Sequence, residues 1–296
     1  MVNSNLNKLF RNLLVTCPNK DGGIYLSDKS GNFDKLCNYL TTGIAISNKF
    51  FLRNFQTENQ LLYLNNLITK KENYLELEDP HDVKVIDNLI YLVETFTNSI
   101  KVLDLNLNIL KTVTFPGAND SMHINCINKI NSNIYFSCFG DFEKQREYNN
   151  FKNEAKGYVV NLNNMQKIIT NLNQPHSIIQ YSKKIYILNS GASEVKIFNE
   201  RFQNVKNIKL KGYLRGIEVT DKIIYIGSSA SRNIDATKNN NFAEIFALDK
   251  KNYKTIAVAT VPSSEIYDIK AIHYSNALNF IQKSTQYYNL LLNQKK

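Results

Sequence analysis

Short apolar segments recur along the whole chain and alternate with short polar segments. The apolar segments are rich in Ile, Val, Tyr and Phe, as in "NLIYLVE" and "KIYILN". The segments between them consist mostly of Asn, Asp, Ser, Lys and Gly. This pattern predicts β-strands joined by tight turns, because branched and aromatic side chains favour strands and these polar residues favour turns.

A unit of four predicted strands repeats along the chain. Successive starts are separated by 38, 42, 53, 39 and 52 residues, and two of the longer intervals carry polar insertions at 141–156 and 229–241. A four-strand unit with a period near forty indicates a β-propeller, in which each unit forms one blade. The units begin at Gly43, His81, His123, His176, Arg215 and Tyr267.

The two ends of the chain complement each other. The first unit has only three strands, in "NLLVTC", "GGIYLSD" and "FDKLCNY", and "IYDIKAIH" near the C-terminus resembles the missing first strand. Pairing these ends in one blade would remove the open sheet edges that invite aggregation. We therefore expect an all-β fold, a six-bladed β-propeller over residues 1–276 that is closed by a C-terminal strand.

The last segment has a helical pattern. An amphipathic helix over residues 277–296 would form an apolar stripe and pack on the outside or one rim of the propeller. A helix that docks a protein partner is the alternative. The stripe consists of Leu278, Phe280, Ile281, Tyr288, Leu291 and Leu292.

Composition narrows the class of protein. The net charge is +10, but the lysines are scattered through turns, so a solvated surface is favoured and a nucleic-acid partner is not expected. The four cysteines show no CxxC spacing, and no apolar run reaches the length of a signal peptide or a membrane span. These features predict a cytoplasmic protein with reduced thiols.

Three of the four histidines begin successive repeat units. Because the first strand of every propeller blade lines the central channel, His81, His123 and His176 are expected to meet at the mouth of the channel. Arg215 and the Tyr267–Asp268 pair begin two further units and are expected nearby. His273 falls outside this register and is expected to lie elsewhere.

Further polar residues are predicted at the same face. The ends of the second strands carry Glu94, Asp141, Asn189, Ser190, Ser228 and Arg232. The predicted catalytic residues are Arg215, Asp268, Tyr267, Glu94 and Arg232. The predicted substrate-binding residues are Asn125, Ser177, Asn189, Ser190, Ser228 and Asp141. Loops raised on a rigid scaffold are where binding and catalysis concentrate.

The histidine cluster allows several kinds of chemistry. Three neutral imidazoles can hold a divalent metal such as Zn, Mn or Fe and leave one coordination position open. Three histidines can equally hold an anion or exchange protons near neutral pH. A purely structural role, in which they cap strand ends, is also open. No HExxH, P-loop, GxGxxG or GxSxG motif narrows the choice.

Several motifs resemble a mostly bacterial family of predicted propellers that is known only as a domain of unknown function. The resemblance covers residues 12–273, departs around residues 143–157, and implies the fold without implying a reaction. Proteins similar to its members occur with glycosyl-transfer and surface-polysaccharide functions, which hints at sugars. The motifs are "PHDV" at Pro80, "HINCI" at His123, "PHSI" at Pro175, "LNSG" at Leu188, "RGIEV" at Arg215, "IGSSASR" at Ile226 and "EIYDI" at Glu265.

The sequence thus predicts a metal-dependent lyase or hydrolase that acts on a small polar substrate, either sugar-derived or carboxylated. At the level of fold, the histidine cluster is similar to those of the peptidyl-hydroxyglycine lyase propeller and oligogalacturonate lyase. Gluconolactonase-type propellers use a calcium site of carboxylates and amides, which the cluster does not match. The alternative is a propeller that binds a glycan or a protein without turnover.

Overall fold

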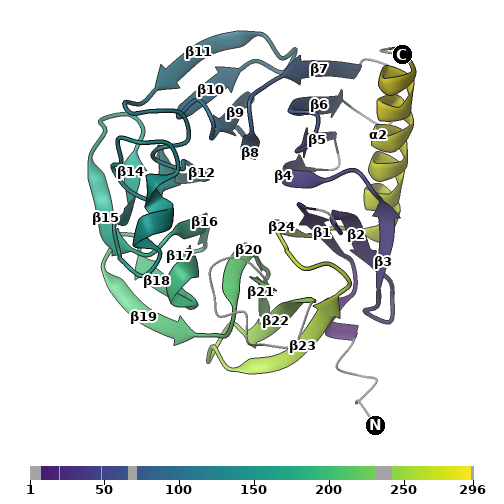
Figure 1. The fold of residues 1–296 in the computed structure, drawn as a ribbon. Helices are drawn as coiled ribbons and strands as arrows, with labels where there is room; N and C mark the ends of the chain where they lie inside the picture. Colours follow the sequence, from purple (N-terminus) through teal and green to yellow (C-terminus); the bar gives the residue numbers. More distant parts are fainter. Residues whose placement is uncertain (1–7, 20, 48, 66–71, 231–241, 295–296) are drawn as a thin grey trace.

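The computed structural model describes residues 8–19, 21–47, 49–65, 72–230 and 242–294. Figure 1 shows six four-stranded antiparallel sheets arranged as a ring, with one helix on the outside. The chain is therefore a six-bladed β-propeller, as the repeat predicts. The predicted Arg232 and most of the insertion at 229–241 lie outside the described residues.

Each blade consists of four strands ordered from the channel outward. Blade 1 contains β24 (Asp268–Ala271), β1 (Leu13–Cys17), β2 (Gly23–Ser27) and β3 (Phe33–Cys37). Blade 2 contains β4 (Thr41–Ile46), β5 (Phe50–Phe55), β6 (Gln60–Asn65) and β7 (Glu72–Glu76). Blade 3 contains β8 (Pro80–Ile86), β9 (Leu89–Glu94), β10 (Ser99–Leu103) and β11 (Ile109–Thr114).

The remaining blades follow the same order. Blade 4 contains β12 (Cys126–Ile130), β13 (Asn133–Cys138), β14 (Gly157–Asn161) and β15 (Lys167–Leu172). Blade 5 contains β16 (Pro175–Tyr181), β17 (Lys184–Asn189), β18 (Glu194–Asn199) and β19 (Asn204–Lys209). Blade 6 contains β20 (Tyr213–Val219), β21 (Ile223–Ser229), β22 (Ala243–Asp249) and β23 (Thr255–Val261). Three short 3-10 helices are η1 (Lys8–Phe10), η2 (Glu147–Phe151) and η3 (Ser190–Ala192).

The ring closes through blade 1, which combines both ends of the chain. Strand β24 pairs antiparallel with β1, from Leu13 opposite Ala271 to Thr16 opposite Asp268. This confirms the predicted composite blade. Apolar side chains of neighbouring blades pack between the sheets, as in the clusters that join blades 3 and 4 and blades 5 and 6.

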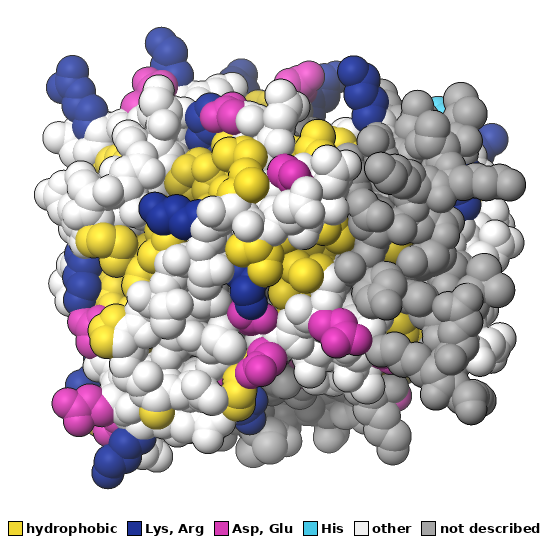
Figure 2. Space-filling model, turned by 90° about the horizontal axis from the view of Figure 1, so that it is seen from above, with side chains coloured by type: hydrophobic (Ala, Val, Ile, Leu, Met, Phe, Trp, Pro, Cys, Tyr) yellow, Lys and Arg dark blue, Asp and Glu magenta, His cyan; other side chains and the backbone are white. Residues whose placement is uncertain are grey.

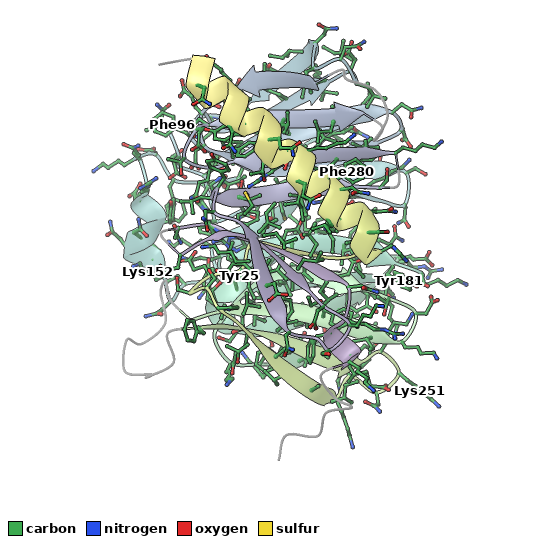
Figure 3. The ribbon with its side chains drawn as sticks, turned by 90° about the vertical axis from the view of Figure 1, so that its right-hand side faces the viewer. Tyr25, Phe96, Lys152, Tyr181, Lys251 and Phe280 are labelled. Carbon is green, nitrogen blue, oxygen red and sulfur yellow. The ribbon has the colours of Figure 1, made fainter. Side chains whose placement is uncertain are left out.

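Helix α2 (Tyr274–Gln294) lies across the outside of blades 1 and 2 (Figure 3). Phe280 packs on Phe51 with 5.7 Å between ring centroids, and Tyr288 stacks on Phe55 at 4.3 Å. Ile281 is also buried and Leu278 is half-buried, whereas Leu291 and Leu292 lie outside the described side chains. The apolar stripe therefore packs on the propeller, and a protein partner for the helix would have to contact its polar face.

The outer wall of the propeller carries mixed charge. On the face shown in Figure 2, Lys and Arg side chains are interspersed with Asp and Glu, and the apolar side chains lie between them. Such mixing is typical of a solvated surface. Among the described residues, no helix is long and apolar enough to cross a membrane.

The helix contact yields a test of the fold. Phe280→Ala is expected to lower the free energy of unfolding by about 3 kcal/mol or more, because it leaves a cavity between the helix and blade 2. Gln286→Ala, at an exposed position of the same helix, is the matched control and is expected to change it by less than about 0.5 kcal/mol. Urea unfolding measures both values, and equal effects of the two substitutions would contradict this packing.

Candidate functional site

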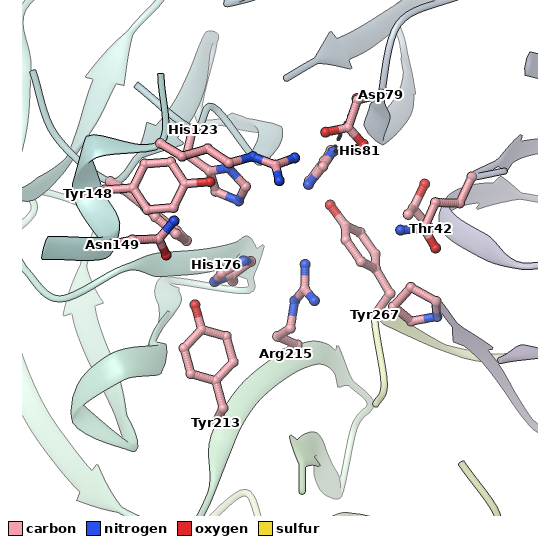
Figure 4. A pocket seen from close by; sticks show the side chains of 14 residues that line it. Thr42, Asp79, His81, His123, Tyr148, Asn149, His176, Tyr213, Arg215 and Tyr267 are labelled. Carbon is pink, nitrogen blue, oxygen red and sulfur yellow. Dashed lines mark hydrogen bonds and ion pairs between the residues drawn. The ribbon is translucent and has the colours of Figure 1, made fainter. Parts of the chain in front are cut away.

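A cavity of about 270 Å³ opens at the mouth of the central channel. It brings together the three histidines of the predicted cluster with Arg215 and Tyr267 (Figure 4). Loops between the second and third strands of blades 1, 2 and 4 complete its wall. The residues that line it are Pro18, Thr42, Gln56, Asp79, His81, His123, Phe139, Arg146, Tyr148, Asn149, His176, Tyr213, Arg215 and Tyr267.

His123 reaches the cavity in a different way from the other two histidines. In blade 3, His81 lies three residues before Lys84, which pairs with Tyr91 of the second strand. In blade 5, His176 lies three residues before Ile179, which pairs with the equivalent tyrosine. In blade 4 Asn125 takes that place. His123 lies two residues earlier, in a loop, with a φ of 48°. The predicted register is therefore wrong for His123. Its ring nevertheless enters the cavity from the loop, with 4.2 Å between its centroid and that of the Phe139 ring.

Two histidines are each held by an aspartate. The Nδ1 atom of His81 lies 3.1 Å from the backbone oxygen of Asp79 and 3.3 Å from its carboxylate. The Nδ1 atom of His123 lies 2.8 Å from the carboxylate of Asp120. Acceptors at Nδ1 hold the proton there, so each neutral ring presents the lone pair of Nε2. The centroids of the two rings are 5.2 Å apart.

The aspartates are charged because of these contacts. Burial alone would raise the pKa of Asp79, but the facing His81 outweighs it and the pKa lies below its usual value. Burial also raises the pKa of Asp120, but its hydrogen bonds with His123 and Arg146 outweigh burial, and the pKa lies below its usual value. Burial lowers the pKa of His123, although Asp120 opposes that effect.

His176 is fixed in the same tautomer by neutral groups. Its Nδ1 atom lies 3.1 Å from the backbone oxygen of Gln174 and 3.0 Å from the hydroxyl of Ser190. That hydroxyl donates to the backbone oxygen of Leu214, so it accepts from the histidine. Burial, and then the positive charge of Arg215, hold the pKa of His176 well below its usual value. Its Nε2 atom is buried without a partner in the described part of the chain.

Arg215 and Tyr267 form the floor of the cavity. The Arg215 guanidinium lies 4.5 Å from the centre of the Tyr267 ring and 3.4 Å from the carboxylate of Glu265. Its Nε atom is buried and has no partner among the described residues. The Tyr267 hydroxyl donates to the backbone oxygen of Asn125, so this side chain crosses the channel from blade 1 to blade 4. Burial raises the pKa of Tyr267 well above its usual value, so the phenol stays protonated.

The insertion in blade 4 covers part of the mouth. Its segment before and within η2 supplies Arg146, Tyr148 and Asn149 to the cavity. Asp120, whose side chain is only 1% exposed, accepts from Arg146 Nε at 2.7 Å and from the Tyr148 hydroxyl at 3.1 Å. The carboxylate that orients His123 therefore also anchors the insertion.

Several residues of this site were not predicted from the sequence, among them Asp79, Asp120, Arg146 and Tyr148. A usable signal existed for the aspartates, because "DPH" and "DSMH" each place an aspartate two or three residues before the histidine. No comparable signal marked Arg146 and Tyr148, since an insertion has no counterpart in the other units.

Asp268 lies below the mouth, in a separate chamber of about 30 Å³ that also contains Asn125 and Ser177. Tyr267 and His176 line both spaces. Asp268 accepts from Lys270 at 3.0 Å, and its second oxygen lies 3.9 Å from Lys84. The structure therefore separates Asp268, Asn125 and Ser177 from the mouth, although the sequence places them there.

Several predicted site residues stabilise loops instead of lining the cavity. The buried Glu94 carboxylate accepts from the Glu78 backbone at 2.7 Å and also bonds Lys101. Ser228 donates to a backbone oxygen, and Asp141 is exposed and pairs with Lys167. Asn189 accepts from the Asn173 backbone and donates to the Glu194 carboxylate. Ser190 donates to the backbone oxygen of Leu214 and also orients His176. His273 is exposed and lies beside η1, away from the mouth.

The donor set does not suit a metal ion. Among the described residues, no group of three His, Cys, Asp or Glu side chains is placed to hold one. Calcium needs six or more oxygen ligands, whereas this cavity offers mainly ring and guanidinium nitrogens and one carboxylate, that of Asp79. The expected metal role of His81, His123 and His176 is therefore not supported by their arrangement.

The buried histidines predict a pH dependence of stability. The unfolded chain binds a proton on each histidine near pH 6.5, whereas folded His123 and His176 do so only at lower pH. The free energy of unfolding is therefore expected to fall as the pH drops below 6.5, by up to about 1.4 kcal/mol per pH unit for each histidine. Urea unfolding between pH 7.5 and 5 measures the slope.

His176→Gln is expected to reduce this slope, and His273→Gln, at the exposed histidine, is the matched control. An unchanged slope in His176→Gln would show that the folded protein already protonates His176 in this range.

Comparison with known proteins supports the fold. A chain of the nidogen/laminin complex superposes with a TM-score of 0.62 at 13% identity, over 88% of this chain and 98% of that one. A protein of unknown function from Bacteroides caccae gives 0.61 at 12%, over 87% and 97%. The calcium-binding protein regucalcin from Agrobacterium tumefaciens gives 0.54 at 11%, over 78% and 77%. At these identities the likeness shows the propeller fold alone.

A search of the curated proteins found no match. The family comparison does find one, and it extends from the first strand of blade 2 into helix α2. Residues 41–281 match the model of the family described as "Domain of unknown function (DUF4915)". Because the match covers most of the chain, this propeller belongs to that family.

Proposed function

We propose that the mouth of the channel binds a small carboxylated molecule and moves a proton on it, in a lyase-type elimination. The observation that carries this proposal is the pair of aspartate-held histidines, His81 and His123, whose rings lie 5.2 Å apart beside the buried Arg215. An aspartate at Nδ1 fixes the tautomer of a histidine and stabilises its protonated form, which suits it to general acid–base catalysis.

Arg215 supplies the anchor for the carboxylate. It is the buried guanidinium at the floor, and its Nε–H has no partner among the described residues. A guanidinium can form two parallel hydrogen bonds with a carboxylate, which fixes its orientation. A carboxylate held there would place the adjacent carbon between the histidines on the wall of the cavity.

The reaction would need no external oxidant or cofactor. His123 Nε2 takes the proton from the carbon next to the carboxylate, and the electrons of that C–H bond form a carbon–carbon double bond. The C–O bond to the leaving group breaks, and the departing oxygen takes up the proton that His123 Nε2 had removed. Arg215 stabilises the negative charge that develops on the carboxylate during proton removal.

The first test uses purified protein and a panel of uronates and other hydroxy acids, with absorbance of the unsaturated carboxylate as the measure. Asp120→Asn is expected to lower kcat by roughly 10²- to 10⁴-fold with little change in KM, since it removes the group that orients the base. Arg215→Met is expected to weaken binding of the carboxylate. Asp141→Asn, at an exposed residue on the same face, is the control.

A wild-type protein that binds no carboxylate would contradict the whole proposal. Binding that depends on Arg215, without turnover of any compound, would instead favour a propeller that recognises its ligand without changing it. Turnover that is unaffected by Asp120→Asn would show that His123 is not the base.

A divalent metal held by the three histidines is the competing version of this site. It predicts near-stoichiometric Zn, Mn or Fe in protein purified without a histidine tag, and loss of that metal in His123→Ala. We expect less than about one metal per ten chains, because three histidines bind such an ion tightly only when their nitrogens converge tetrahedrally. Elemental analysis gives the answer, and one metal per chain would overturn the metal-free reaction.

A further inference from the structure

The cavity presents an unusual combination of hydrogen-bonding groups. We infer that it is built for a hydroxylated monocarboxylate about the size of one sugar ring, and that His176 accepts a hydrogen bond from one of its hydroxyl groups. This inference rests on the proposed function, because it specifies the molecule that the same site would take.

The three histidines all offer acceptors. His81, His123 and His176 each have an acceptor oxygen at Nδ1, so each neutral ring carries its hydrogen on Nδ1 and a lone pair on Nε2. His176 is the most constrained of them, because neutral groups hold its Nδ1 and its buried Nε2 has no partner in the described residues. A hydroxyl group is the common ligand group that donates to such an atom.

The hydroxyl groups of the cavity do not add donors. Tyr148 donates to Asp120, Tyr267 to the backbone of Asn125, and Tyr213 lies 3.0 Å from the side-chain oxygen of Gln174. Among the described residues that line the cavity, the buried donor that remains for a ligand is Arg215, whose Nε has no partner while one of its other nitrogens bonds Glu265. A ligand that matches this set therefore has one strong acceptor, such as a carboxylate, and several donors, such as hydroxyls.

The charges favour a single negative charge on the ligand. Asp79 lines the cavity, and His81 lowers the pKa of its carboxyl group. A ligand in the cavity therefore lies near a negatively charged carboxylate of the protein. Arg146 is already paired with Asp120 at 2.7 Å. A phosphate dianion would meet the Arg215 guanidinium, which already pairs with the buried Glu265 at 3.4 Å, and the Asp79 carboxylate. A monocarboxylate can bind Arg215 through its remaining N–H groups and direct a hydroxyl toward Asp79.

The volume limits the size of the ligand. Ligand sites commonly measure roughly 300–1,000 Å³, and this cavity, at about 270 Å³, lies just below that range. Tyr267 closes its floor by crossing the channel, and the insertion with Arg146 and Tyr148 closes part of its rim. A monomeric sugar acid fits these limits better than an oligosaccharide.

Calorimetric titration of the purified full chain at pH 7.5 tests this inference with four probes. Glucuronate carries both features, cyclohexanecarboxylate lacks hydroxyls, glucose lacks the charge, and glucose 6-phosphate carries a dianion. Glucuronate is expected to bind at least about tenfold more tightly than each of the other three, because unpaired polar groups in the site penalise a ligand that lacks their partners.

Substitution of His176 provides the second measurement. His176→Leu is expected to weaken glucuronate binding about tenfold and to leave the weaker binding of cyclohexanecarboxylate unchanged, because Arg215 holds the carboxylate in both. His273→Leu is the matched control and should alter neither affinity. If His176→Leu does not fold, the ranking of the four probes on the wild-type protein still decides the question.

The outcomes separate this inference from the proposed function. If glucuronate and cyclohexanecarboxylate bind equally well and both depend on Arg215, the carboxylate site stands and the hydroxyl preference is wrong. If glucose 6-phosphate binds most tightly, the single-charge argument is wrong. If no carboxylate binds, both the site and its specificity are refuted.

Discussion

The pairing of β24 with β1 is the interaction on which the rest of the structure depends. A ring of sheets has two free edges until its ends join, and free edges expose unpaired backbone groups. Here strands from opposite ends of the chain close the ring, and Thr16 reinforces the seam by accepting from the Asp268 backbone and donating to Thr42 in blade 2. Closure fixes the width of the channel, and that width lets Tyr267 reach across it to blade 4.

The closed ring explains why a polar cavity can exist in the centre of a small protein. Buried polar groups cost free energy unless they are hydrogen-bonded, and the inner strands supply these bonds from neighbouring turns. Asp79, Asp120 and the Gln174 backbone each satisfy one nitrogen of a histidine. The opposite nitrogen of His176 has no hydrogen-bond partner in the described part of the chain, so the fold itself determines which atom of this ring faces the ligand.

The sequence predicts the architecture well, because a repeat is a periodic signal and closure follows from one missing strand. It also predicts that His81, His176 and Arg215 share one face, since they occupy equivalent places in regular strands. It fails where the chain is irregular. The loop before β12 shifts His123 by two positions. The side chains of Glu94 and Asn189 accept hydrogen bonds from the backbone of neighbouring loops, because these side chains are buried and need partners.

The backbone around Asp120 positions the side chains at this corner of the cavity. Asp120, His123 and Arg146 all adopt left-handed conformations, with φ values of 51°, 48° and 54°. Each such conformation is unfavourable for a residue with a side chain, at about 1 kcal/mol, and persists only where the surroundings determine it. Two of these residues, His123 and Arg146, also contact the Asp120 carboxylate directly, at 2.8 and 2.7 Å. Their joint effect is to aim His123 into the cavity and to hold the insertion over it, as the proposed proton transfer in a covered site would require.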